Sequence, residues 1–149
     1  MRGQFARAGS RVGFADQRTL AQLLAIAGLV GTVVGRADDR LVGRPFGVGW
    51  PGGRSGGLLF WGTAVSGPLA MDGLLLVLAA MRGMGPRDRQ VGRALRLIGL
   101  IVVIGQCAEP VTFRRRSVGA AARAVMASNL VLGTTLAVTP GSGISGSTP

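Results

Sequence analysis

A small set of polar side chains interrupts the apolar parts of this sequence, and any chemistry would depend on them. The set consists of two carboxylates, two arginines and one amide: Asp72, Glu109, Arg96, Arg123 and Asn129. Each lies within or at the edge of an apolar run, where an ionisable group is costly unless it has a partner or a function. These residues therefore indicate either clamps between helices or a path for a proton or a solute.

Asp72 is the candidate for proton-linked chemistry, because it is the single charge in a stretch of 27 residues. In straight helices that rise about 1.5 Å per residue, Asp72 and Glu109 differ in depth by roughly 13 Å. That separation is too large for the two carboxylates to share a proton. The long side chain of Arg96 is expected to reach the level of Asp72. A structural role and a functional role for Asp72 stand as alternatives.

The remaining polar residues indicate structural contacts. Glu109 and Arg123 are expected at similar depths on neighbouring helices, where an ion pair would neutralise both and join the two helices. Asn129 falls near the middle of its run, where its amide can form a hydrogen bond to another helix. Pro68 lacks an amide donor, and it predicts a kink near residues 64–68.

Several kinds of catalytic and binding site are missing from the sequence. There is no histidine, so an imidazole base and a Ser–His pair are excluded. The single cysteine, Cys107, allows neither a disulfide within the chain nor a cysteine-based metal site. No phosphate-binding loop or dinucleotide-binding motif is present. We therefore expect no catalytic residue, no cofactor, no metal and no enzymatic activity.

Four apolar runs must position the polar residues. They predict helices over residues 20–35, 58–81, 94–113 and 118–139, with arginine-bearing connections between them. Helices of this length and composition are typical of segments that cross a hydrocarbon core of roughly 30 Å. The fold class predicted is all-α, an integral membrane four-helix bundle. The alternative is three spanning helices, with the run over 94–113 lying at the interface or only partly inserted.

The domain organisation follows from the position of these runs. A basic N-terminal arm, residues 1–18, precedes a single transmembrane domain, residues 19–139, and a flexible C-terminal tail, residues 140–149, follows it. The arginine-rich start resembles that of a signal peptide. We expect a retained first helix instead, because no convincing small-x-small cleavage site appears before Arg36 and further runs of membrane-spanning length come later.

The charge pattern identifies the expected partners. All 17 basic residues are arginines, and with 6 acidic residues they give a net charge of +11. The arginines lie between the apolar runs, which is typical of a membrane protein rather than of a nucleic-acid-binding protein. The expected partners are the lipid bilayer and either a second copy of this chain or another membrane protein, without nucleic acid. The basic arm favours an N-terminus on the inner side of the membrane.

Lines of small residues complete the pattern, because they let helices approach closely in lipid. Such lines are Ala27, Gly31 and Gly35 in the first run, Gly62, Ser66 and Ala70 in the second, and Ala120, Ala124 and Ser128 in the fourth. We expect a multi-pass protein of a bacterial plasma membrane, the bacterial inner membrane. Its expected role is that of an accessory or structural subunit acting through helix packing. The alternative is a small proton-coupled transporter that uses Asp72 as its titratable site.

Overall fold

The computed structural model of this chain describes residues 9–37, 41, 57, 59, 62–109 and 118–140, with side chains of the first helix described from Gln17 onward. Four helices make up most of these residues. They are α1 (Gly9–Ala37), α3 (Leu69–Met81), α4 (Asp88–Ala108) and α6 (Ala120–Val138). The all-helical fold that the sequence predicts is confirmed.

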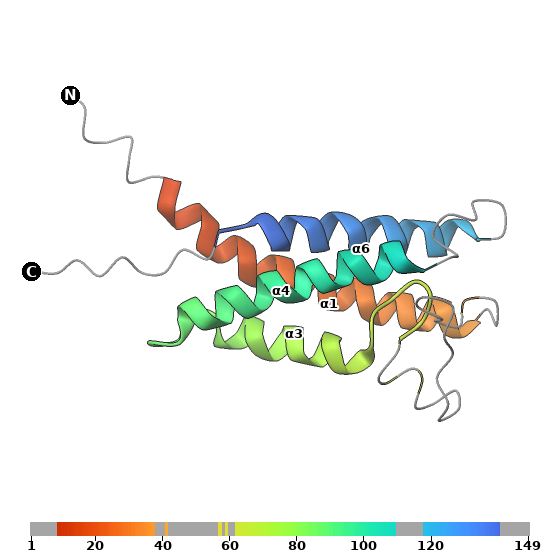
Figure 1. Cartoon of the computed structure of the whole chain (residues 1–149), viewed down its shortest axis with the longest axis horizontal. Coiled ribbons are helices and arrows are strands. Elements are labelled where there is room, and N and C mark those ends of the chain that lie inside the picture. Colours follow the sequence, from red (N-terminus) through yellow and green to blue (C-terminus); the bar gives the residue numbers. More distant parts are fainter. Residues whose placement is uncertain are drawn as a thin grey trace, which may run out of the picture.

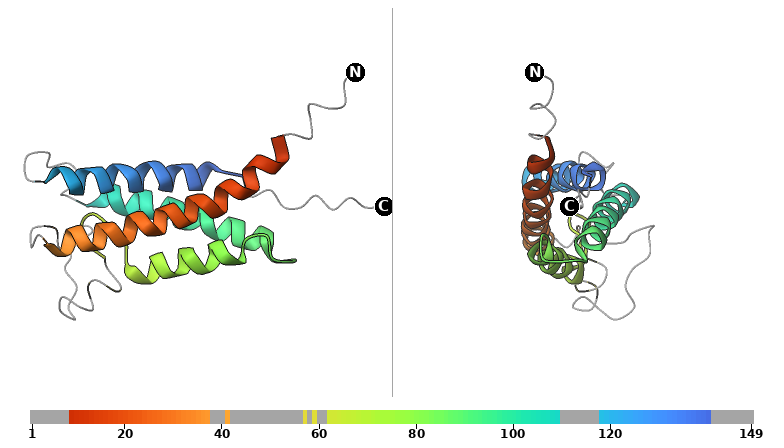
Figure 2. Two further views of the ribbon diagram at one scale, coloured as in Figure 1. Left: turned by 180° about the vertical axis from the view of Figure 1, so that it is seen from behind. Right: turned by 90° about the vertical axis from the view of Figure 1, so that its left-hand side faces the viewer.

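The helices form an antiparallel bundle (Figure 1). α1 and α4 run in one direction, and α3 and α6 run in the other. Each helix packs against the next one along the chain, and α6 closes the ring by packing against α1 (Figure 2). α1 and α4 lie diagonally opposite each other and touch little. Polar residues that face the inside of the ring can therefore meet even when they are far apart in the sequence.

Three of the helices are long and apolar enough to cross a membrane, namely the part of α1 from Gln17 to Ala37, α4 and α6. α3 has 13 residues and a length of about 20 Å, so it is too short to cross on its own. The continuous helix predicted over residues 58–81 is wrong, because residues 62–68 are not helical. The short member of the bundle is thus the second run, whereas the alternative with three spanning helices made it the third.

The third run forms a helix that is displaced from its predicted bounds. α4 begins at Asp88, before the predicted residue 94, and ends at Ala108. Glu109 follows in an extended conformation, with φ −75° and ψ 122°, as expected of a residue that precedes a proline. The carboxylate of Asp88 lies in the first turn, where the helix dipole favours a negative charge. The local sequence therefore accounts for both ends of α4.

Two apolar clusters fill the bundle. One draws on all four helices and contains Ala21, Leu24, Ala25, Leu75, Ala79, Val91, Leu95, Ile98 and Leu136. The other surrounds the non-helical segment and contains Leu41, Ala64, Val65, Val118, Ala122 and Met126. Large apolar side chains also cover the outside, and Val33 and Val131 are 71% and 65% exposed. A surface of this kind is suited to lipid rather than to water.

Glycines bring α4 and α6 into close contact. A Cβ atom added at Gly99 would lie 2.7 Å from the carbonyl oxygen of Gly133. Real Cβ atoms do not approach an oxygen so closely, so these two backbones can pack together only because Gly99 lacks a side chain.

Candidate functional site

Residues 63–66, here called the buried turn, replace the helix that the sequence predicts. Thr63 and Ser66 pair across the turn, with the amide of Thr63 donating to the carbonyl of Ser66 at 3.0 Å. The hydroxyl of Thr63 accepts the amides of Val65 and Ser66 at 3.3 and 3.1 Å. All four residues of the turn are buried. Non-helical backbone at such a position needs hydrogen-bond partners from elsewhere in the protein.

Two helices supply such partners to the backbone of the turn, and a third pairs with one of its side chains. The side-chain amide of Gln106 on α4 donates to the carbonyl of Ala64 at 3.2 Å. The amide of Asn129 on α6 donates to the carbonyl of Val65 at 2.8 Å. The hydroxyl of Thr32 on α1 lies 3.0 Å from that of Ser66, within hydrogen-bonding distance. The buried turn is therefore held from three sides by neutral side chains.

Glycines on α1 make room for the turn. A Cβ atom at Gly31 would lie 2.8 Å from the Cβ atom of Ser66, and one at Gly35 would lie 2.6 Å from that of Thr63. The hydroxyl of Thr63 also donates to the carbonyl of Gly31, at 3.5 Å. Gly31 and Gly35 thus receive the buried turn, and Gly31 also lies against Val125 on α6.

Pro68 marks the point at which the helix resumes. It is the N-cap residue of α3, with φ −60° and ψ 140°. Its carbonyl accepts the amides of Met71 and Asp72 at 2.9 and 3.2 Å, which closes the first turn of α3. The kink predicted near residues 64–68 is thus a complete interruption, because the hydrogen bonds of the buried turn replace those of a helix.

Asp72 lies in this first turn and packs against α1. A Cβ atom added at Gly28 would overlap its carboxylate. The side chain is 4% exposed, and its Oδ2 atom has no hydrogen-bond partner in the part of the chain that the structure describes. A buried carboxylate without a donor is costly, so packing alone does not explain this position.

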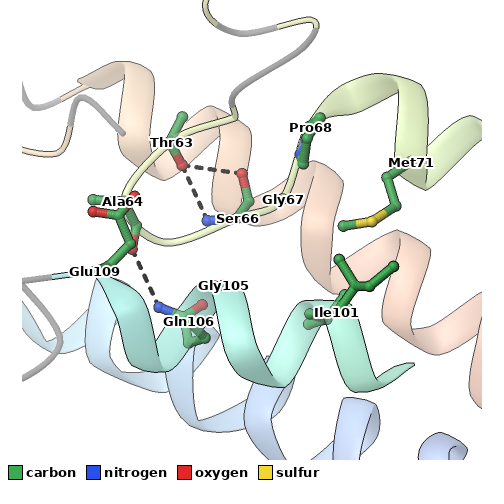
Figure 3. A pocket seen from close by; sticks show the side chains of 11 residues that line it. Thr63, Ala64, Ser66, Gly67, Pro68, Met71, Ile101, Gly105, Gln106 and Glu109 are labelled. Atoms are coloured by element: carbon green, nitrogen blue, oxygen red, sulfur yellow. Dashed lines mark hydrogen bonds between the residues drawn. The ribbon is translucent and has the colours of Figure 1, made fainter. Parts of the chain in front are cut away.

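A pocket of about 190 Å³ lies between the buried turn and α4 (Figure 3). Its walls are formed by the turn, the start of α3 and one face of α4, with Thr63, Ala64, Ser66, Gly67, Pro68, Met71, Ile101, Val102, Gly105, Gln106 and Glu109 as lining residues. Ile101 is 55% exposed, so the pocket reaches the outer surface of the bundle. Typical ligand pockets begin at about 300 Å³, so this one is suited to a small group.

A second group of polar residues, here called the end cluster, joins the helices where α1 lies beside the end of α3 and the start of α4. Arg82, which follows α3, forms an ion pair with Asp88 at the start of α4. Its Nε atom also donates to the side-chain oxygen of Gln17 on α1 at 2.9 Å. The amide of Gln17 then donates to the carbonyl of Thr139, after α6, at 3.0 Å. Four segments of the chain therefore meet in one network.

The ion pairs expected from the sequence do not form between described residues. Glu109 is buried at the end of α4, whereas Arg123 is exposed on α6, and no ion pair joins them. Arg96 is half-buried on α4 and makes no ion pair with Asp72. Both expectations rested on helix bounds that the interruption before α3 and the early start of α4 displace.

The side chain of Asn129 forms a hydrogen bond to another segment of the bundle as expected, but that segment is the buried turn rather than a helix. Sequence reasoning did not assign roles to Thr32, Arg82 or Gln106. Gln106 carried a usable signal, because it is the one polar side chain in the apolar stretch 97–108. Arg82 carried none, since an arginine after an apolar run is ordinarily solvated.

Metal binding receives no support from the geometry. Among the residues that the structure describes, no group of three or more His, Cys, Asp or Glu side chains lies close enough to hold a metal ion. Comparisons of this chain with models of protein families, with curated proteins and with solved structures each found no match.

Proposed function

We propose that this chain is a non-enzymatic, multi-pass protein of a bacterial plasma membrane that serves as an accessory or structural subunit. The observation that carries the proposal is that buried polar side chains hold the segments of this chain together. Thr32, Gln106 and Asn129 all engage the buried turn. Three helices long enough to span a membrane and an apolar outer surface support insertion into lipid.

The outer face of α6 offers a surface for another helix. Its small residues Ala120, Ala124 and Ser128 are exposed, whereas those of α1 are covered by the buried turn. A line of exposed small residues lets a second transmembrane helix approach closely, which strengthens van der Waals packing. An accessory subunit that acts through helix packing needs such a face.

The test compares two substitutions of the same kind in the full chain. Ala124→Leu places a large side chain on the exposed face of α6, and Ala80→Leu does so at an exposed position of α3. The assembly state is measured by single-molecule photobleaching and by the mass of the complex extracted from host membranes in mild detergent. We expect an assembly larger than the monomer that Ala124→Leu weakens and Ala80→Leu leaves intact. A wild-type chain that is monomeric in both measurements contradicts the proposal.

A second candidate function, proton-coupled transport, is favoured by Asp72. Its carboxylate is buried, its Oδ2 atom lacks a partner within the described residues, and α3 begins inside the bundle next to the pocket. Interrupted helices with an ionisable side chain nearby are typical of transport sites in membrane proteins. Under this proposal Asp72 exchanges a proton while a small solute occupies the pocket.

Proton flux into proteoliposomes that contain a pH-sensitive dye separates the two functions. In a transporter, Asp72→Asn reduces the flux to that of protein-free liposomes, while Gln22→Leu, at an exposed polar position of α1, retains it. Both variants are expected to keep the helix content of the wild type, because Asn is nearly isosteric with Asp. Unchanged flux in Asp72→Asn rules out the transport role, and it leaves the accessory role standing.

A further inference from the structure

The first part of α4 carries a row of arginines on one face. Arg89, Arg93 and Arg96 are spaced by four and three residues, so they project from the same side of the helix. Arg89 and Arg93 are exposed, and Arg96 is half-buried. The three residues, here called the arginine row, extend over about 10 Å along the helix axis.

The arginine row is not neutralised by acidic residues that the structure describes. Asp88 is the acidic residue next to it, but its carboxylate is buried and forms its ion pair with Arg82. Among the described residues, no ion pair involves Arg89, Arg93 or Arg96. The exposed Arg87 directly precedes α4, and the exposed Arg18 follows Gln17, which bonds to Arg82, so both add positive charge at this end of the bundle. An anionic group is therefore attracted to this end.

The same face of α4 continues as an apolar surface. Leu100 and Ile104 follow the row at the same helical spacing and are 48% and 53% exposed. A ligand that lies along this face thus meets guanidinium groups first and aliphatic side chains next. Free phosphate satisfies only the first part of this surface, whereas a phospholipid satisfies both.

We propose that the arginine row and the adjoining residues Leu100 and Ile104 form a binding site for an anionic phospholipid. The guanidinium groups bind the phosphate through charge-assisted, paired hydrogen bonds. The acyl chains lie along the apolar continuation of α4. Arginine side chains near the end of a membrane-spanning helix extend towards the headgroup layer, so the guanidinium groups of the row bind the phosphate there while the backbone of α4 crosses the hydrocarbon core. The inference rests on membrane insertion, which is part of the proposed function, and not on the role of Asp72.

The test uses the full chain in nanodiscs of phosphatidylcholine that contain a spin-labelled lipid. Its readout is the ratio of the association constants of phosphatidylglycerol and phosphatidylcholine. An arginine near the surface changes the affinity for an anionic lipid by about fivefold. We therefore expect a preference for phosphatidylglycerol that Arg89→Gln with Arg93→Gln lowers by about 25-fold at most. The control Arg36→Gln with Arg123→Gln, at exposed sites towards the opposite end, leaves the ratio unchanged.

Each outcome has one meaning. An equal loss of preference in the control pair overturns the proposal, because any surface arginine would then act alike. A chain with Arg89→Gln and Arg93→Gln that keeps the wild-type preference also overturns it. So does inorganic phosphate that binds the wild type in phosphatidylcholine nanodiscs as tightly as phosphatidylglycerol does, since the row would then be a site for free phosphate. A chain that enters the nanodiscs but shows no preference contradicts this inference alone. A chain that does not enter them contradicts the membrane assignment itself.

Discussion

The buried turn and the end cluster both join helices through polar groups, but they use different chemistry. At the buried turn, neutral amides and hydroxyls bind backbone carbonyls. At the end cluster, an ion pair between Arg82 and Asp88 is combined with the amide of Gln17. Charged groups thus join the helices at one end of the bundle, and neutral donors stabilise the buried turn, which lies against the last turns of α1 and α4. Asp72 belongs to neither group. It is a buried carboxylate whose Oδ2 atom has no hydrogen-bond donor among the described residues.

The difference follows from the free energy of burial. Removing an ion from water costs several kcal/mol even when it is paired, and the cost is smallest where the helices end. A neutral hydrogen bond between helices in a membrane contributes less, on average about 0.6 kcal/mol. Loss of one charged partner should therefore affect the fold more than loss of one neutral donor. Three substitutions test this order.

The largest effect is expected from Arg82→Met. The substitution removes the guanidinium and leaves the carboxylate of Asp88 buried without its ion pair, which destabilises a protein by about 3–5 kcal/mol. The free energy of unfolding is measured by titration with SDS in mixed micelles. Arg87→Met, at an exposed neighbouring position, serves as the control and should change little. Equal effects of the two variants would mean that the end cluster does not stabilise the bundle.

An intermediate effect is expected from Gly35→Ala. The added methyl group would lie 2.6 Å from the Cβ atom of Thr63, so either α1 or the buried turn must shift, at a cost of about 1–3 kcal/mol. The control is Gly73→Ala on α3, where nothing lies within 4 Å of the added atom. That control should be stabilising by about 1 kcal/mol, because alanine favours a helix over glycine. If both variants are stabilised in the same SDS titration, the close contact between α1 and the turn is refuted.

The smallest effect is expected from Asn129→Ala, which leaves the carbonyl of Val65 without its donor. A loss of about 1 kcal/mol in the free energy of unfolding is expected. Thr134→Ala, at an exposed position on the same helix, is the control and should have no measurable effect. Hydrogen exchange at Thr63–Ser66 gives a second measurement, because faster exchange limited to the turn would locate the loss there. Unaltered exchange in Asn129→Ala would argue against the bond.

The helical class and the number of helices could be predicted from the sequence, because each run is apolar and is preceded by a segment that contains arginine. The buried turn could not be predicted in the same way. Gly62, Gly67 and Pro68 weaken a helix there, but they equally allow a simple kink. What stabilises the turn is the supply of donors and space by Gly31, Gln106 and Asn129, which are distant in the sequence. A pattern read along one segment contains no information on such partners.

In the candidate site too, single residues could be identified from the sequence, but their partners could not. Asp72, Asn129 and Pro68 were identified as polar or breaking residues, and the structure places all three close to the interruption of the second run. The pairings of Glu109 with Arg123 and of Asp72 with Arg96 failed because they depended on helix depth. A displacement of a few residues in a helix boundary changes both depth and direction, so such pairings require the helix bounds to be known.

The contacts of the buried turn have a consequence for the order of events during synthesis. The carbonyls of Ala64 and Val65 receive their hydrogen bonds from Gln106 and Asn129, which are translated after the turn itself. A nascent chain that ends before α4 contains these carbonyls without those donors. The turn has both of these hydrogen bonds only after α6 has been made, so its observed conformation depends on segments that follow it in the chain.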